Sequence, residues 1–252
     1  GKKLKIIVTG AIGHIGSYLI RDLGVFFPKS NIVMIDNMMT QRFSSLFHLP
    51  LSANYSFIEG DVSQMNLKSV FLGADIVIHL AAITDAAGSI DKAEELEANN
   101  FKSTLRVAEA CIEADASLIA LSSTSVYGTQ KEQVDENCDD SELQPQSPYA
   151  TTKLKEEELI ASLSKEKGLK AIHCRFGTIF GASQGMRFHT AVNKFCWQAV
   201  MNQPISVWST AYNQKRPYLD LLDASRAIAF IINNNIFDGQ IYNILTSNAT
   251  VK

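Results

Sequence analysis

Residues 4–16 of this 252-residue chain read LKIIVTGAIGHIG. The apolar run at residues 6–8 has the character of a strand buried on both faces, and residues 17–23 after the glycines favour a helix. Glycine lets the backbone turn tightly between the two and approach another group closely. The N-terminus of such a helix offers unpaired N–H donors. Strand, helix and the intervening turn with Gly10, Gly13 and Gly16 together predict a site for the pyrophosphate of a dinucleotide.

An acidic residue stands where a dinucleotide site needs one. Asp36 lies twenty residues beyond Gly16, at the end of a second apolar run, residues 32–35. A carboxylate there can accept hydrogen bonds from both hydroxyls of the adenosine ribose, and it repels a 2′-phosphate. The cofactor is therefore predicted to be NAD rather than NADP. Asp61 and Val62 follow a third strand segment at residues 57–58 and are expected at the adenine edge.

The rest of the chain continues this alternation. Further short apolar runs lie at residues 76–78, 118–121 and 171–174, with stretches long enough for crossover helices between them. The pattern predicts an α/β fold, a doubly wound parallel sheet of Rossmann type. The alternative, a closed eightfold barrel, needs regular repeats over about 250 residues, and the rhythm breaks after Phe176. We expect a dinucleotide-binding domain over residues 1–177 and a smaller substrate lobe over residues 178–252.

Composition and charge exclude several classes of partner. The chain has 23 basic and 26 acidic residues, a net charge of -3 and 46% hydrophobic residues. No basic footprint for nucleic acid or for an anionic membrane surface is present. No apolar run is long enough to cross a membrane, and residues 1–3 lead into a strand instead of a signal peptide. Widely spaced cysteines predict reduced structural thiols in a cytoplasmic protein; they are Cys111, Cys138, Cys174 and Cys196.

Three polar residues are placed for the oxidation of an alcohol. Ser123 follows the run at 118–121, and Pro148, favoured in the first turn of a helix, puts Tyr149 and Lys153 on one helical face. A phenol has an ordinary pKa near 10, so Tyr149 can act as a base near neutrality only beside a positive charge. Lys153 and the nicotinamide ring can supply that charge, Lys153 can also reach the nicotinamide ribose, and Ser123 can hold the substrate hydroxyl. This arrangement predicts proton removal from an alcohol while hydride leaves its carbon.

These motifs, with several others, occur in an order that resembles the extended short-chain dehydrogenase/reductase family, in particular its NAD-dependent sugar epimerase/dehydratase group. The resemblance extends over essentially the whole chain and rests on residues 10–16, 79–82, Asn100 with Thr104, 122–128, 149–153, 175–181 and 216–218. It implies tightly bound NAD as cofactor and a nucleotide-diphosphate sugar as substrate. It also implies a catalytic triad of Ser123, Tyr149 and Lys153, with Arg216 at the substrate diphosphate.

The predicted site is larger than the triad. Residues expected to contact the cofactor are Gly10, Gly13, His14, Ile15, Gly16, Asp36, Asn37, Asp61, Val62, Leu80, Ala81, Ala82, Asn100, Tyr149 and Lys153. Residues expected to contact the substrate are Thr84, Ser123, Thr124, Thr178, Arg187 and Arg216. Arg187 is equally well explained as a solvated surface residue. No metal site is expected.

The resemblance favours one reaction among several. Dehydratases of this group carry Asp and Glu directly after the triad hydroxyl, where this chain has Thr124 and Ser125. Neither hydroxyl exchanges protons as readily as a carboxyl group. Epimerisation at carbon 4, as in the UDP-glucose 4-epimerases, is therefore the leading hypothesis. The alternatives are a 4-ketosugar reductase or NAD-dependent dehydrogenase of the same fold, then a 4,6-dehydratase or a non-catalytic dinucleotide sensor.

Two further expectations concern the whole molecule. In relatives, a segment resembling residues 239–244 is followed by more helices and a second arginine motif, so the sequence shown is expected to be an incomplete version of a longer protein. The predicted helices over residues 92–111 and 149–167 resemble the pair that forms the dimer interface in this group. A homodimer is expected, unless the apolar stripes of these helices face only the sheet.

Overall fold

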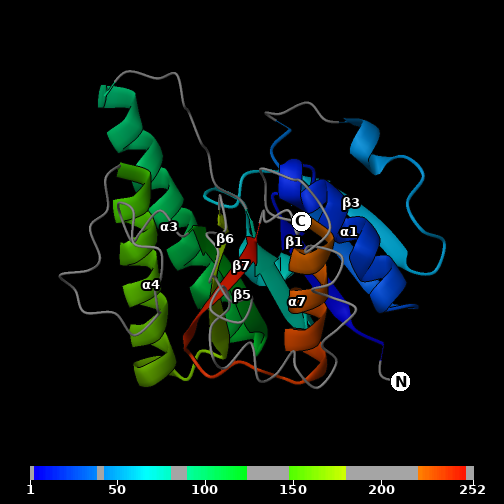
Figure 1. Ribbon diagram of the computed structural model, residues 1–252. Coiled ribbons are helices and arrows are strands. Elements are labelled where there is room, and N and C mark those ends of the chain that lie inside the picture. Colours follow the sequence, from blue (N-terminus) through cyan, green and yellow to red (C-terminus); the bar gives the residue numbers. More distant parts are fainter. Residues whose placement is uncertain (1–2, 39–42, 81–89, 124–147, 180–220, 248–252) are drawn as a thin grey trace, which may run out of the picture.

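The apolar runs form the central strands of one parallel sheet (Figure 1). The computed structural model describes residues 3–38, 43–80, 90–123, 148–179 and 221–247. Within these residues the sheet has seven strands in the order β3-β2-β1-β4-β5-β6-β7, and every neighbouring pair is parallel. The strands are β1 (Lys5–Thr9), β2 (Asn31–Asp36), β3 (Asn54–Glu59), β4 (Ile76–His79), β5 (Ser117–Ser123), β6 (Ala171–Ile179) and β7 (Ile241–Ser247).

The strand order reverses between β1 and β4. The chain builds outward from β1 through β2 to β3, then crosses to β4 on the other side of β1 and continues outward to β7. In a doubly wound sheet, ligands bind at the carboxyl ends of the strands beside such a reversal. The predicted doubly wound fold is confirmed, and the described sheet is open rather than a barrel.

Helices cover both faces of the sheet (Figure 1). On one face α1 (His14–Phe26) packs beside α7 (Leu221–Asn233), and on the other α3 (Ile90–Ala114) packs beside α4 (Pro148–Lys167). The short α2 (Leu67–Val70) lies against α3, and a 3-10 turn, η1 (Phe43–Leu46), follows β2. The helix expected to begin at Pro148 does begin there.

Alternate residues of each strand enter two separate cores. Ile6 and Val8 of β1 pack with the apolar side chains of α1 and α7, whereas Ile7 between them packs with those of α2, α3 and α4. The same alternation divides β2, with Ile32 on the first side and Val33 on the second. Because side chains alternate across a strand and both faces are covered, these strands read in the sequence as unbroken apolar runs.

The sheet continues beyond the boundary expected at residue 177. Strand β6 extends through Ile179, and β7 pairs with it along its length. Helix α7 packs on α1. Both α7 and β7 therefore belong to the Rossmann layers, although the sequence pattern assigned them to the substrate lobe. The apolar pattern does not reveal β7, because this strand has interspersed polar residues, lies at the edge of the described sheet and is separated from β6 by a long stretch of chain. Residues 180–220 lie outside the described part, so a lobe there stays a prediction.

Two of the four cysteines are described, and both are free and buried. Burial raises the thiol pKa of Cys111, and it raises that of Cys174 to about 12. Both thiols therefore stay protonated and are structural, as predicted. Cys138 and Cys196 lie outside the described residues.

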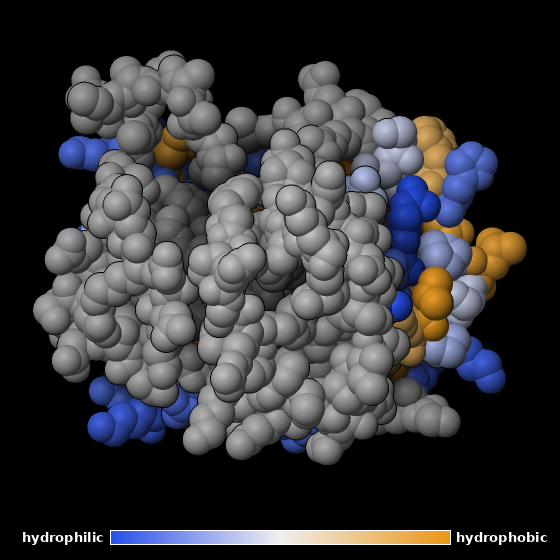
Figure 2. All heavy atoms as spheres, viewed as in Figure 1, coloured by the Kyte–Doolittle hydropathy of each residue, from blue (hydrophilic) through white to orange (hydrophobic). Residues whose placement is uncertain are grey.

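The visible surface of the described residues mixes apolar and polar side chains. In Figure 2 orange hydrophobic atoms are interspersed with blue hydrophilic ones at the right of the molecule, over the region of α1 and β3. Interspersed apolar side chains of this kind are ordinary on a protein surface. No helix among the described residues has the length and apolar character needed to cross a membrane.

Candidate active site

The glycine turn lies at the carboxyl end of β1, beside the reversal of strand order. Gly10 has φ of +65°, a conformation that glycine adopts without strain, and its carbonyl accepts a hydrogen bond from the Gly13 N–H at 3.1 Å. A Cβ on Gly16 would lie 2.3 Å from the Gly10 carbonyl oxygen and 2.7 Å from that of Ala11. Helix α1 can approach the turn this closely only because residue 16 has no side chain.

The N-terminus of α1 carries no side-chain cap. Its N-cap residue, Gly13, makes no side-chain capping hydrogen bond, and the first turn carries no acidic residue. The partial positive charge and unpaired N–H groups of the first turn therefore face the turn without a protein carboxylate nearby in sequence. This is the arrangement that binds phosphate at helix N-termini.

Asp36 is anchored to the same turn. It ends β2 and is only 7% exposed, and its two carboxylate oxygens accept hydrogen bonds from the backbone N–H of Ile12 at 3.2 Å and of Met38 at 2.9 Å. The carboxylate is thus held beside the glycine turn, where the ribose of a dinucleotide is expected.

A residue that the sequence pattern did not single out holds the segment after β3. Asp61 accepts a hydrogen bond from the Ser63 N–H at 2.8 Å, which starts a tight turn. The guanidinium of Arg106, on α3, donates to the carbonyl of Val62 and, at 2.7 Å, to that of Met65. Arg106 therefore fixes the backbone of the predicted adenine-contacting residues. No sequence signal marked it, because an arginine on a predicted helix usually faces solvent.

The three residues of the predicted triad come from two neighbouring elements. Ser123 is the last residue of β5, Tyr149 lies in the first turn of α4, and Lys153 follows one helical turn later. Lys153 is buried, and its Nζ lies 3.1 Å from Oε2 of Glu156. Ser123 thus ends β5 at the carboxyl edge of the sheet, and Tyr149 and Lys153 lie in the first turns of α4.

The sequence model of the NAD dependent epimerase/dehydratase family matches residues 6–244, which include the glycine turn, Asp36 and all three triad positions. The chain belongs to this family. The expected family is confirmed, and with it the NAD dependence of the enzyme.

Named relatives within the family differ in reaction. An uncharacterized UDP-glucose epimerase of Bacillus subtilis, YtcB, is 30% identical over 250 residues, covering 96% of this chain and 76% of the relative. An Arabidopsis thaliana trifunctional UDP-glucose 4,6-dehydratase/UDP-4-keto-6-deoxy-D-glucose 3,5-epimerase/UDP-4-keto-L-rhamnose-reductase is 29% identical over 248 residues, covering 96% of this chain and 36% of that protein. The structure of UDP-glucuronic acid 4-epimerase from Bacillus cereus with NAD matches with a TM-score of 0.62 at 29% identity, over 81% of this chain and 64% of the other.

The described residues fit the NAD of this family. The close approach of α1 to the turn, its uncapped N-terminus and the anchored Asp36 carboxylate are the features that a pyrophosphate and an adenosine ribose require. Within the described residues, no group of three or more His, Cys, Asp or Glu side chains could hold a metal ion.

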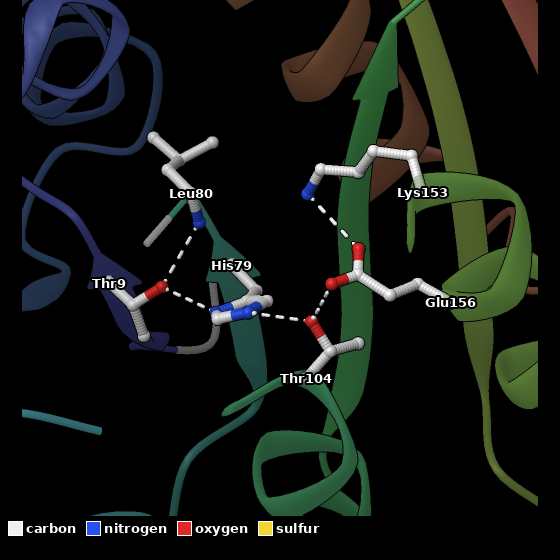
Figure 3. A network of polar contacts seen from close by, with 6 residues as sticks. All are labelled: Thr9, His79, Leu80, Thr104, Lys153 and Glu156. Atoms are coloured by element: carbon white, nitrogen blue, oxygen red, sulfur yellow. Dashed lines mark hydrogen bonds and ion pairs between the residues drawn. The ribbon is translucent and has the colours of Figure 1, made fainter. Parts of the chain in front are cut away.

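A chain of buried polar contacts connects the strand before the glycine turn to Lys153, the lysine of the predicted triad (Figure 3). Thr9 Oγ1, at the end of β1, lies 2.7 Å from His79 Nδ1, and His79 Nε2 lies 3.2 Å from Thr104 Oγ1. The Thr104 hydroxyl donates to Glu156 Oε1 at 3.0 Å, and Glu156 pairs with Lys153. Burial, and then the charge of Lys153, lowers the pKa of His79 to about 3, so its ring is neutral at pH 7.

The remaining predicted contacts divide into two groups. Leu80 follows β4 beside the glycine turn, and Asn100 is buried on α3. His14, Ile15 and Asn37 lie in or next to the elements that carry the turn and Asp36, and Thr178 lies in β6. The others fall outside the described residues, namely Ala81, Ala82, Thr84, Thr124, Arg187 and Arg216.

An Asp36→Asn variant should bind NAD about tenfold to a hundredfold more weakly, because it loses the charge that strengthens the hydrogen bonds from the ribose hydroxyls. The preference for NAD over NADP should narrow at the same time, because the repulsion of the 2′-phosphate is gone. Dissociation constants for both dinucleotides measure this. Glu59→Gln is a matched control, since Glu59 is exposed and is aligned with Asp36 in the pairing of β3 with β2. Equal effects of the two substitutions would contradict a ribose-binding role for Asp36.

His79 should make the stability of the fold depend on pH. Its pKa is about 3 in the folded protein against an ordinary 6.5, so between these values the unfolded chain binds the proton more strongly. The stability it contributes is complete above pH 6.5 and falls by about 1.4 kcal/mol per pH unit as the pH drops toward 3. Urea unfolding of the wild type and of His79→Gln should give curves of stability against pH that converge in this range. His48→Gln, at an exposed histidine, should follow the wild type; parallel curves for His79→Gln would contradict the prediction.

Proposed function

We propose that this protein epimerises a nucleotide-diphosphate sugar at carbon 4. The proposal is carried by Thr124 and Ser125, which stand where dehydratases of the group carry an acid and a base. Without a carboxyl pair, the elimination of water lacks its proton donor and acceptor. The hydride transfer required for epimerisation needs only the triad, and the proposal assigns this role to Ser123 at the end of β5 and to Tyr149 and Lys153 at the start of α4.

In the proposed mechanism, Tyr149 removes the proton from the 4-hydroxyl of the sugar and Ser123 holds that hydroxyl against the phenol oxygen. The positive charge of Lys153 stabilises the phenolate. NAD supplies the acceptor and, in the return step, the donor of the hydride. For the return step the 4-keto sugar would present its other face, and Tyr149 would give the proton back to the oxygen on carbon 4. The reaction leaves no net change in redox state.

In this proposal, individual side chains bind the anionic substrate, rather than the overall charge of the protein. The chain is mildly acidic, so overall charge does not attract a diphosphate. We assign Arg216 to the diphosphate and place Thr84, Thr124, Thr178 and Arg187 around the sugar nucleotide. A homodimer formed through α3 and α4 belongs to the same proposal.

A reductase or dehydrogenase is the second candidate, because it would use the same triad. One relative combines dehydratase, epimerase and reductase activities in its name. The two classes differ in cofactor balance: a dehydrogenase accumulates NADH, whereas an epimerase recycles it within one turnover.

The deciding experiment incubates the purified protein with UDP-galactose and follows the formation of UDP-glucose by chromatography, together with the absorbance of reduced nicotinamide. Conversion without accumulation of NADH supports the epimerase. Failure to convert any of a panel of UDP- and dTDP-sugars, by a protein that contains intact NAD, would overturn the proposal. Net NADH formation would replace it with the dehydrogenase.

A further inference from the structure

We propose that Glu156 is a positioning residue for Lys153, and that a one-way chain of buried hydrogen bonds from the backbone of β4 holds its carboxylate in place. The inference rests on the proposed function, in which the Lys153 ammonium acts on Tyr149. Glu156 itself touches neither substrate nor cofactor in this proposal.

The chain joins four separate elements of the fold. Its side chains come from β1, β4, α3 and α4, and they point toward one another in the interior (Figure 3). They are Thr9, His79, Thr104, Glu156 and Lys153, none of which is more than 6% exposed. Water therefore competes little for these contacts, and each polar group depends on its protein neighbours.

The direction of the chain follows from a count of hydrogens. A hydroxyl has one hydrogen, and that of Thr104 goes to Glu156, so Thr104 can only accept from His79 Nε2. A neutral imidazole carries one N–H, which leaves His79 Nδ1 as an acceptor for the Thr9 hydroxyl. Thr9 Oγ1 in turn accepts from the backbone N–H of Leu80 at 3.0 Å.

Every bond of the chain therefore points from the backbone toward Glu156. The end of the chain receives a hydrogen bond at Oε1 from Thr104 and an ion pair at Oε2 from Lys153. The hydrogen bond and the ion pair are both strongest when the carboxylate is ionised. The chain fixes both oxygens, and through Oε2 it fixes the position of the Lys153 ammonium.

Opposing effects act on the ionisation of Glu156. The net effect raises the pKa of Glu156: burial raises it most and the charge of Glu97 on α3 raises it further, and together they outweigh the lowering by Lys153 and by the hydrogen bonds from Lys153 and Thr104. Among the described residues, the charged groups that act on this carboxylate are thus Lys153 on α4 and Glu97 on α3. Lys153 is the partner on which its negative charge depends.

The buried ion pair of Lys153 and Glu156 is better explained as a means of positioning the lysine than as a source of stability. A buried ion pair is weak as a source of stability, since desolvation opposes the attraction. A lysine side chain is flexible, and holding it in one place costs rotamer entropy. An anchored carboxylate one turn further along α4 confines the ammonium to the helical face on which Tyr149 also stands, four residues before Lys153.

The test measures the pKa of the Tyr149 phenol in the NAD-bound protein. The phenolate absorbance is followed against pH, and the same titration of a matched protein that also carries Tyr149→Phe is subtracted from it. Glu156→Gln should raise the phenol pKa by about one pH unit or more, because the ammonium is no longer held beside the phenol. The acid limb of kcat against pH should move the same way, and kcat at neutral pH should fall about tenfold with a much smaller change in KM. Glu158→Gln, at an exposed position on the same helix, should behave like the wild type.

A second pair of variants tests the chain itself and does not alter any charge. Thr104→Val removes the hydroxyl between His79 and Glu156 at nearly constant shape and should raise the phenol pKa as Glu156→Gln does. Thr104→Ser restores a hydroxyl and should restore the wild-type profile. If Glu156→Gln does not fold, these two Thr104 variants still test whether the hydrogen-bond chain positions Lys153.

The outcomes separate this inference from the proposed function. A lower phenol pKa in Glu156→Gln would show that Glu156 only screens the lysine charge, and an unchanged phenol pKa with reduced stability would show a structural role; either overturns the inference. The phenol titration needs no turnover. If no sugar is converted but the phenol pKa shifts as expected, the proposed epimerase activity is wrong and the positioning role of Glu156 is supported. If sugar is converted but the phenol pKa does not shift, only the positioning role is wrong.

Discussion

Tyr149→Phe is expected to lower turnover by about 10²- to 10⁴-fold, the contribution typical of a positioned acid or base. A phenyl ring can neither take the proton from the sugar hydroxyl nor return it, so both directions of hydride transfer should slow together. NAD should remain bound, because the glycine turn, Asp36 and Lys153 are untouched and the phenyl ring of the variant keeps the shape of the Tyr149 ring. Steady-state kinetics and the NAD content of the purified variant measure the two effects.

Tyr55→Phe is a matched control, because it removes a phenol hydroxyl from a part of the fold away from the triad. The Tyr55 hydroxyl donates to the Ile20 carbonyl at 2.5 Å, where it ties β3 to α1. Its loss should lower the unfolding midpoint and leave turnover intact. Normal turnover in Tyr149→Phe would remove Tyr149 from the mechanism. Loss of NAD along with turnover would indicate that α4 has been displaced.

The sequence predicts the central part of the sheet well, because strands covered on both faces leave unbroken apolar runs. The runs at residues 6–8, 32–35 and 118–121 all lie in strands of the described sheet. Strand β7 is different, because it mixes apolar and polar residues and has one sheet neighbour among the described strands, β6. Hydrophobic pattern alone did not identify it, and pairing with β6 is what places it in the sheet.

In the candidate site, too, motifs formed by residues close in sequence can be predicted, whereas contacts between distant residues cannot. The glycine turn, Asp36 and the Tyr149–Lys153 pair are local patterns, so the sequence reveals them. Glu156 lies in a run of charged residues that reads as a solvated helix face, and only the packing of α4 on α3 shows it to be buried. Its spacing of three residues from Lys153 was the available signal. Arg106 depends in the same way on a loop more than forty residues earlier in the chain.

Gly16→Ala is expected to have the second large effect, through the contact between α1 and the glycine turn. The added Cβ would lie 2.3 Å from the Gly10 carbonyl oxygen, 2.7 Å from the Ala11 carbonyl oxygen and 2.8 Å from the Ala11 carbonyl carbon. All three are backbone atoms, so no side chain can rotate away and α1 must move. Overpacking of this kind costs about 1–3 kcal/mol of stability. NAD affinity should fall further than stability suggests, because the displaced helix no longer presents its N–H groups to the pyrophosphate.

Gly13→Ala separates steric displacement from a general intolerance of alanine in the turn. A Cβ at residue 13 would meet only the Gly10 carbonyl oxygen, at 3.3 Å, and its φ of -66° is accessible to alanine. Urea unfolding should therefore show a smaller loss of stability for Gly13→Ala than for Gly16→Ala, and calorimetric titration should show the larger loss of NAD affinity at residue 16. If Gly16→Ala retained both wild-type stability and wild-type NAD affinity, α1 could not lie as close to the turn as described. The helix N-terminus would then have to reach the pyrophosphate from another position.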